Sequence, residues 1–177
     1  MKTLITFGSP HQGVFGVPGC NETTDSYLLC EMVRQLISAG AYEDWIQDLV
    51  TPAQYWQDPL NATNYRQGSH FLAPINNELE LKNEDYKRRI EQLENFVMVM
   101  FNQDDVVDPK ESAHFEFYSP GQDSEILPLN ESAIFQENWL GLRTLSETGR
   151  LHFFSVDGKH VQIDYEWVAH NIIPFLL

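Results

Sequence analysis

The sequence of 177 residues is poor in basic residues and in cysteine. Eleven lysines and arginines stand against 26 aspartates and glutamates, which gives a formal net charge of −15. Such a charge repels a phosphate backbone, so nucleic acid is not an expected partner. The two cysteines, Cys20 and Cys30, are too few for a four-thiolate zinc site. They flank a polar stretch, and a single disulfide between them is geometrically possible.

Long apolar runs and several familiar motifs are also missing. No segment approaches the ~18 consecutive apolar residues of a membrane span. The chain has no H-E-x-x-H, P-loop or G-x-G-x-x-G motif, and its histidines lack the spacing of metal ligands. Neither a metal nor a cofactor is therefore predicted. A G-x-S-x-G motif, which surrounds the nucleophilic serine of many hydrolases, is absent as well.

What is present is typical of one soluble globular domain. Hydrophobic residues make up 42% of the chain and charged residues 21%, and 177 residues suffice for a single core. The glycosylation sequons at Asn21, Asn61 and Asn130 fit a secreted or lysosomal protein. A signal peptide is not recognisable, because the first apolar run ends before Gly8. We expect either a cytosolic protein or that Met1 is an internal methionine of a longer chain.

Three short apolar runs predict buried strands. They are Thr3 to Phe7, Phe96 to Phe101 and Leu151 to Val156. The run FVMVMF has no polar alternation, which is typical of a parallel sheet covered on both faces. Minor strands or loops are expected at residues 115–118 and 126–129.

Helical patterns separate these strands. A helix capped by Asp25 or Ser26 is expected before Gly40, followed by short helices and loops through residue 71. A second helix begins after Asn83, and a brief one is expected over residues 140–145. The chain closes with a helix over residues 164–175, whose inward-facing residues are predicted to be Tyr165, Val168 and Ile172.

Two chemically capable residues follow neighbouring predicted strands. Asp104 comes directly after the run 96–101, and His160 comes after the run 151–156 in the turn Gly158-Lys159-His160. A carboxylate that binds one imidazole nitrogen fixes the tautomer, so that the other nitrogen can accept a proton from a nucleophile. The simpler alternatives are that Asp104, Asp105 and Asp108 form a solvated acidic turn and that His160 lies in an ordinary turn.

Several segments carry a specific family resemblance. FGSPHQGVFGVPGC, AGAYEDWIQ, AQYWQDPLN, FVMVMFNQDDVVDP, SVDGKHVQI and EWVAHNIIPFLL are similar to the C-terminal part of palmitoyl-protein thioesterases. These are lysosomal α/β hydrolases that remove fatty acyl groups from cysteine. The likeness covers nearly the whole chain. It implies an α/β fold, namely the C-terminal part of an α/β-hydrolase domain over residues 1–177.

The resemblance also implies roles for individual residues. Asp104 and His160 match the catalytic acid and base of a Ser-His-Asp thioester hydrolase, whose substrates are S-acylated proteins or peptides. The pair Cys20 and Cys30 matches a family disulfide, although the spacing here is slightly longer. A helical insert over about 14–94 would form the acyl groove. Its border is expected to include the aromatic residues Trp45, Tyr55 and Trp56; the alternative is that each packs the insert's own core.

The nucleophile is the main departure from the family. The family's G-x-S-x-G serine lies before the region where this chain begins, and the loop that donates an oxyanion-hole N–H goes with it. Ser9 is no substitute, because Pro10 denies the backbone N–H that normally follows a nucleophile. The run at residues 3–7 should have an unpaired edge. We therefore expect the fold to need an N-terminal part; the alternatives are a non-catalytic acyl-binding or interaction module and an unfolded product of a truncated gene.

Overall fold

The computed structural model describes residues 2–16 and 37–176, and its centre is a sheet of three parallel strands. The strands are β1 (Thr3–Phe7), β2 (Asn95–Phe101) and β5 (Leu151–Val156), in the spatial order β1-β2-β5. The three predicted main strands are confirmed to within one residue. The architecture is therefore α/β with a parallel sheet, as expected from the sequence.

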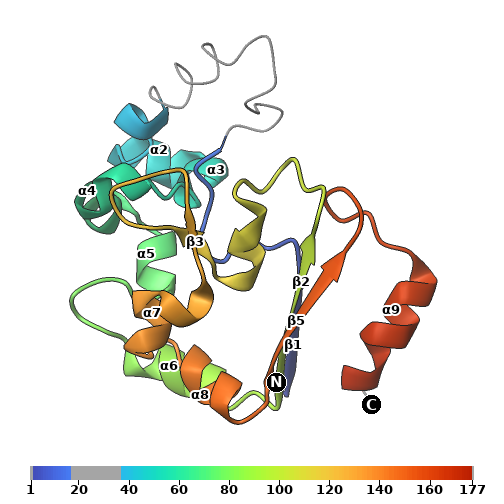
Figure 1. Ribbon diagram of the computed structural model, residues 1–177. Coiled ribbons are helices and arrows are strands. Elements are labelled where there is room, and N and C mark those ends of the chain that lie inside the picture. Colours follow the sequence, from blue (N-terminus) through green and yellow to red (C-terminus); the bar gives the residue numbers. More distant parts are fainter. Residues whose placement is uncertain (1, 17–36, 177) are drawn as a thin grey trace.

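The central strand β2 is buried on both faces. Phe96 and Met98 belong to one apolar cluster, whereas Val97 and Val99 belong to another. Because successive side chains of a strand point to opposite faces, two separate cores enclose the sheet. Figure 1 shows α9 (Tyr165–Asn171) on one side of the strands and most other helices on the opposite side. The prediction that the uninterrupted apolar run FVMVMF is a doubly covered strand is confirmed.

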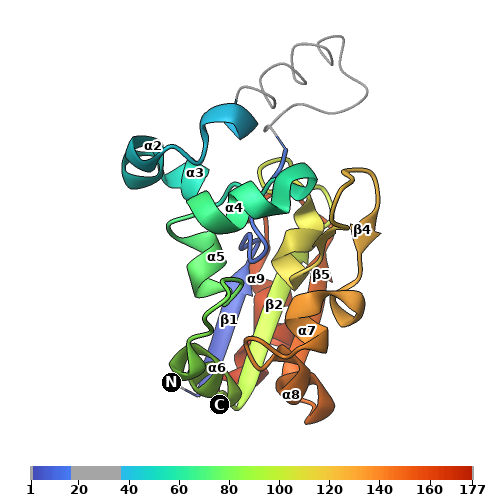
Figure 2. The same ribbon diagram turned by 90° about the vertical axis from the view of Figure 1, so that its left-hand side faces the viewer.

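The segment between β1 and β2 forms short helices. They are α2 (Asp44–Leu49), α3 (Thr51–Gln54), α4 (Ala62–Gly68), α5 (Leu72–Ile75) and α6 (Glu84–Glu91), with a 3₁₀ turn η1 (Pro59–Asn61). In Figures 1 and 2, α2, α3 and α4 lie beyond the carboxyl ends of the strands. The predicted cap of α6 is present, because Asn83 Oδ1 accepts the Asp85 N–H at 3.0 Å. Most of the helix expected after Asp25 lies outside the described residues.

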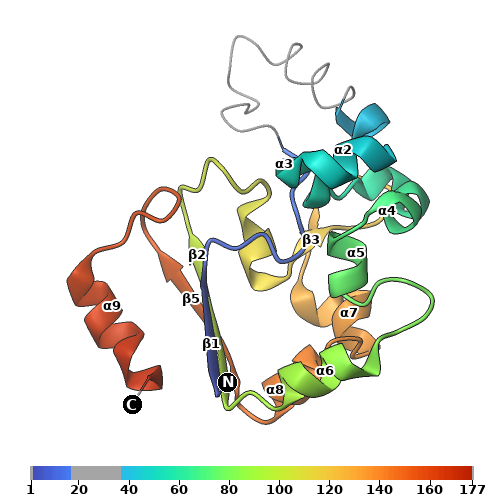
Figure 3. The same cartoon turned by 180° about the vertical axis from the view of Figure 1, so that it is seen from behind.

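The segment between β2 and β5 covers one face of the sheet. It contains η2 (Lys110–His114), β3 (Phe117–Tyr118), β4 (Ile126–Leu127), η3 (Leu129–Glu131), α7 (Ala133–Gln136) and α8 (Leu142–Glu147). The short strands β3 and β4 pair antiparallel in a sheet of their own. Figure 3 shows α8 beside α6 near the amino ends of the main strands, and the brief helix predicted at 140–145 is observed two residues later.

The C-terminal helix differs from the prediction in one respect. Tyr165, expected to face inward, is 78% exposed, whereas Ile172 is buried and Val168 packs against its cluster. The reason is the helix start: Asp164 caps α9 by accepting the Trp167 N–H at 2.8 Å, which leaves Tyr165 at the first, outward-facing position. Beyond α9 the chain continues as the 3₁₀ turn η4 (Ile173–Phe175).

The outer edge of β1 is open, as predicted. Among the residues that the structure describes, β1 pairs only with β2, and all five residues of β1 are half-buried. Among the described residues, no helix has the length and the apolar character that crossing a membrane requires.

Candidate active site

Asp104 and His160 meet at the carboxyl ends of adjacent strands. Asp104 lies in the turn after β2 and His160 in the loop after β5, and the His160 Nδ1 to Asp104 Oδ2 distance is 2.8 Å. The two loops are joined through their backbones as well. Asn102 N–H donates to Val156 O at 2.8 Å, and Gln103 N–H donates to Gly158 O at 3.0 Å. The parallel sheet thus brings together two residues that are 56 positions apart.

Both carboxylate oxygens of Asp104 accept hydrogen bonds. Oδ1 accepts the N–H groups of Val106 and Val107 at 2.9 and 3.0 Å, and Oδ2 faces the imidazole. The Asp104 side chain is 2% exposed, compared with 28% for His160. Because an ionised carboxylate only accepts hydrogen bonds, Nδ1 of His160 carries the shared proton. Its Nε2 is then the nitrogen available to take up another proton.

The neighbouring aspartates have different surroundings. Asp105 is exposed and faces Lys159, with 3.4 Å between Oδ2 and Nζ. Asp108 accepts the N–H groups of Phe15 and Gly16 through its backbone carbonyl. The description of a solvated acidic turn fits Asp105 but not Asp104, which is the aspartate that contacts the histidine.

The backbone of Gly8 packs directly against the imidazole ring of His160. Gly8 follows β1 directly with φ +56°, and its N–H donates to Val99 O at 2.8 Å. A Cβ at this position would lie 3.0 Å from His160 Cε1 and 3.2 Å from Phe101 Cδ2. The positive φ and the close approach both require glycine here. No sequence pattern singled out this residue, because the contact depends on three strands meeting.

An apolar cavity of about 830 Å³ opens beside His160. All three predicted groove residues, Trp45, Tyr55 and Trp56, line it. Trp45 is 64% exposed at the rim, whereas Trp56 is buried and packs against Phe15 at 5.3 Å between ring centroids. Trp56 therefore belongs both to the cavity wall and to the core of the insert. The volume falls within the ~300–1,000 Å³ usual for small-molecule sites.

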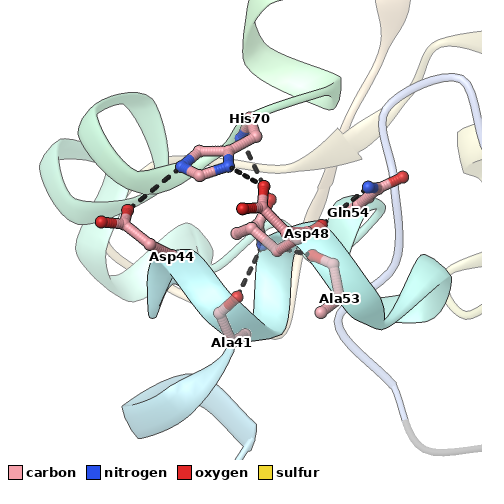
Figure 4. A network of polar contacts seen from close by, with 7 residues as sticks. Ala41, Asp44, Asp48, Ala53, Gln54 and His70 are labelled. Atoms are coloured by element: carbon pink, nitrogen blue, oxygen red, sulfur yellow. Dashed lines mark hydrogen bonds and ion pairs between the residues drawn. The ribbon is translucent and has the colours of Figure 1, made fainter.

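A buried glutamine holds one wall of this cavity. Gln47 in α2 is completely buried, and its Nε2 donates to Ala41 O at 2.6 Å and to Ala53 O at 2.8 Å. Its Oε1 accepts the N–H of His70 at 3.0 Å, and Figure 4 shows this network. Ala41 and Ala53 both line the cavity. Gln47 is thus behind the wall and joins its segments, a role that no sequence pattern revealed.

A second buried polar group links the insert to the loop after β1. Gln12 Nε2 donates to Glu78 Oε1 at 3.2 Å, and Asn76 Nδ2 donates to His11 O at 2.7 Å. Burial raises the pKa of Glu78 to about 7 and lowers the pKa of His11 to about 4. His11 also stacks on Phe115 with 4.5 Å between ring centroids. Both ionisable groups therefore favour their neutral forms.

The remaining predicted positions fall in several places. Ser9 lies in a turn, where its carbonyl accepts the His11 N–H at 2.8 Å, and no hydrogen bond joins Ser9 Oγ to His160 in the described structure. Asn61 and Asn130 are exposed. Cys20, Cys30 and Asn21 lie outside the described residues. Within residues 2–16 and 37–176, no group of three or more histidine, cysteine or carboxylate side chains is placed to hold a metal ion.

These features define a class of protein. A parallel sheet with helices on its faces, and an acid and a histidine on loops at the carboxyl ends of adjacent strands, is the arrangement of an α/β hydrolase. The sequence profile of the family described as palmitoyl protein thioesterase matches residues 1–160. The chain belongs to this family of thioester hydrolases.

Individual relatives agree with the family assignment. The chain is 46% identical to "Palmitoyl-protein thioesterase 1" of Caenorhabditis elegans over 98% of its own length and 57% of the relative's. It is 36% identical to "Palmitoyl-protein thioesterase 3" of Dictyostelium discoideum, over 88% and 51%, respectively. "Lysosomal thioesterase PPT2 homolog" of Drosophila melanogaster is 31% identical over 85% and 50%. The chain thus spans about half the length of the curated relatives it matches.

Proposed function

We propose that this chain supplies the acid, the base and much of the acyl groove of an enzyme that removes long-chain fatty acyl groups from cysteine. The observation that carries the proposal is the placement of the Asp104–His160 pair beside an apolar cavity lined by Trp45, Tyr55 and Trp56. Family membership makes a thioester the natural substrate. The leaving group that follows from the family name is the cysteine thiol of a palmitoylated protein or peptide.

In this mechanism His160 acts first as a base and then as an acid. Nε2 takes the proton of a serine hydroxyl while the serine oxygen attacks the thioester carbonyl. When the C–S bond breaks, the same nitrogen returns the proton to the departing sulfur, leaving an acyl-serine. A water molecule then gives a proton to Nε2 and attacks the ester carbonyl; as the bond to the serine oxygen breaks, Nε2 returns this proton to the serine and the fatty acid is released. Asp104 holds the ring and stabilises the imidazolium that forms in each step.

The serine is not in the 177 residues, because they contain no G-x-S-x-G motif. We infer that it comes from a segment outside this sequence, together with the oxyanion-hole donors, and that this segment covers the open edge of β1. Relatives named lysosomal thioesterases support a lysosomal location for the complete protein. A Cys20–Cys30 disulfide and glycosylation at Asn21, Asn61 and Asn130 belong to the same proposal.

A chimera tests the catalytic proposal. The part of the C. elegans relative that precedes the matched region would be joined to this chain, and release of thiol from a palmitoylated cysteine peptide would be measured. We expect turnover that His160→Ala abolishes and His170→Ala, on the exposed part of α9, leaves intact. Unchanged kcat in His160→Ala would exclude this role for the histidine.

The missing motif also favours a second candidate function, a non-catalytic acyl-binding module. Such a module would retain the cavity and use no chemistry. It is distinguished by the same chimera: binding of a palmitoyl chain without thiol release in a correctly folded chimera would favour the binding module. Turnover would exclude it as the function of this fold.

A further inference from the structure

His70 lies between two carboxylates of one short helix. It precedes α5, and its Nε2 is 3.2 Å from Asp44 Oδ1 while its Nδ1 is 3.1 Å from Asp48 Oδ1. The two aspartates are four residues apart and face the ring from the same side of α2 (Figure 4). The backbone N–H of His70 also binds Gln47 Oε1 of this helix. His70 therefore contacts α2 at three successive points.

The number of protons on the ring decides whether both side-chain contacts are hydrogen bonds. A neutral imidazole has one N–H, so it can donate to one carboxylate and must turn an unprotonated nitrogen toward the other. An imidazolium has two N–H groups and donates to both. The observed geometry, with a carboxylate at each nitrogen, is therefore fully satisfied only when His70 is protonated.

The helix itself gains from this positive charge. α2 has six residues, too few for a helix to be stable without outside contacts. Asp44 lies in its first turn, where a negative charge is favourable, but Asp48 lies near its end, which has no basic residue. Like charges four residues apart also repel each other. A protonated His70 offsets both the negative charge of Asp48 near the end of the helix and the repulsion between the two aspartates.

The position of α2 matters because the helix forms part of the cavity wall. Trp45 and Ile46 of α2 line the cavity next to His160. On the inner side of the helix, Gln47 joins α2 to Ala41 and Ala53, which also line the cavity. A helix held less firmly on its outer side would leave the Trp45 wall less well ordered.

We propose that His70 is a positioning residue for the acyl groove, which fixes the α2 wall when it is protonated and releases one contact when it is not. The inference rests on the proposed function for the identity of the ligand, a long acyl chain. Acid favours the protonated ring, which is the form that can donate to both carboxylates, so acyl binding is stronger at pH 5 than at pH 8.

Within the part of the chain that the structure describes, Asp44 and Asp48 are the ionisable side chains that form ion pairs with the His70 ring. Arg66 on α4 is exposed, and its Nε donates to Ala62 O at 3.1 Å. Glu43 precedes Asp44 in the chain and caps no backbone group through its side chain. Burial raises the pKa of Tyr42 and Tyr65, which stay neutral throughout this range. A metal ion is not expected, because the two carboxylates contact opposite nitrogens of the ring and do not converge on one point.

Binding of an uncharged probe tests the proposal. A fluorescent C16 alkyl ketone mimics the acyl chain and its carbonyl without an ionisable carboxyl, and its Kd for the chimera with the C. elegans N-terminal part would be measured at pH 5 and pH 8. In wild type we expect a higher Kd at pH 8. In His70→Gln the pH 8 to pH 5 ratio of Kd should fall by about two- to fivefold relative to wild type, the range expected for exposed ion pairs. The exposed His170→Gln is the matched control and should keep the wild-type ratio.

Amide hydrogen exchange of α2 provides a readout that needs no ligand. Protection factors, corrected for intrinsic rates, should be higher at pH 5 than at pH 8 in wild type and should lose this difference in His70→Gln. An equal pH dependence of α2 protection in wild type and His70→Gln would overturn the role of His70. If α2 responds as expected but no form of the protein binds the probe, the acyl groove of the proposed function is wrong, and so is the ligand named here.

Discussion

Gly8 touches the imidazole of His160 so closely that no side chain fits between them. A Cβ on Gly8 would lie 3.0 Å from Cε1 and 3.1 Å from Nδ1 of the ring. The residue after β1 therefore limits how far the His160 ring can move, although His160 lies on the loop after β5, two strands away in the sheet. The contact explains why the loop after β1 bears on the proposed chemistry although Ser9 has no catalytic role in it.

Replacing Gly8 by alanine should impair catalysis more than folding. The added methyl group displaces the ring from Asp104, and the left-handed backbone adds a cost of about 1–2 kcal/mol. In the chimera with the C. elegans N-terminal part, we expect kcat to fall at least tenfold with a smaller change in KM. Gly121→Ala is the control, since Gly121 has φ +88° but a Cβ placed on it would meet nothing within 4 Å. An equal fall of kcat in both variants would mean that backbone strain causes the loss, and not the contact with His160.

The two adjacent aspartates should respond very differently to substitution. Asp104→Asn retains the shape of the side chain but cannot hold the Nδ1–H tautomer, and kcat should fall by about 10⁴, the size typical of a serine triad. Asp105→Asn removes only an exposed contact with Lys159 and should leave kcat within about twofold of wild type. Thiol release by the chimera measures both. A large loss in Asp105→Asn would contradict the assignment of Asp104 as the partner of His160.

Glu78 should make the chain less stable as the pH rises. Its folded pKa of about 7 lies above the ordinary pKa of 4.5 for this side chain, because burial disfavours the charged carboxylate. Between pH 4.5 and 7 the folded chain therefore holds a proton that the unfolded chain has released. The contribution of Glu78 to the free energy of unfolding therefore falls by about 1.4 kcal/mol for each pH unit in this window and changes no further above it. His11, whose pKa is lowered to about 4, contributes the opposite slope at acidic pH, so the effect of Glu78 is seen in the difference between a variant and wild type.

The variant Glu78→Gln removes this dependence. Its free energy of unfolding relative to wild type should be higher at pH 8 than at pH 4, as measured by urea titration at each pH. Glu80→Gln serves as the control, because Glu80 is exposed two residues away. Equal shifts in the two variants would show that overall charge, and not the burial of Glu78, determines the pH dependence.

Removing the polar group of Gln47 should destabilise the insert. Gln47→Met has a similar size but leaves the carbonyls of Ala41 and Ala53 and the N–H of His70 without their partner. A buried unpaired group costs about 1–3 kcal/mol, so we expect a loss of at least ~2 kcal/mol in unfolding free energy. The exposed Gln67→Met is the control and should change stability by less than about 0.5 kcal/mol. A loss below about 1 kcal/mol for Gln47→Met would mean that water or a relaxed backbone replaces these hydrogen bonds.

The main strands and the residues at their ends could be predicted from the sequence alone. Apolar runs such as 96–101 form buried strands wherever they pair, because every side chain in them gains from burial on either face. The proximity of Asp104 and His160 followed once those strands were taken as parallel neighbours. The inward face of the last helix was only partly predicted, because periodicity could not locate the start that leaves Tyr165 in solvent.

The residues that surround the proposed site, in contrast, depend on tertiary packing and could not be predicted. Gly8 contacts His160, and His70 contacts Asp44. Gln47 binds both Ala53 and His70. These contacts join segments that are far apart in the chain or have no regular structure. Such contacts have no period and no motif, since each depends on how short helices pack rather than on local propensity. Hydrogen-bonding groups and charges in these segments acquire a role only when folding brings their partners within about 3 Å.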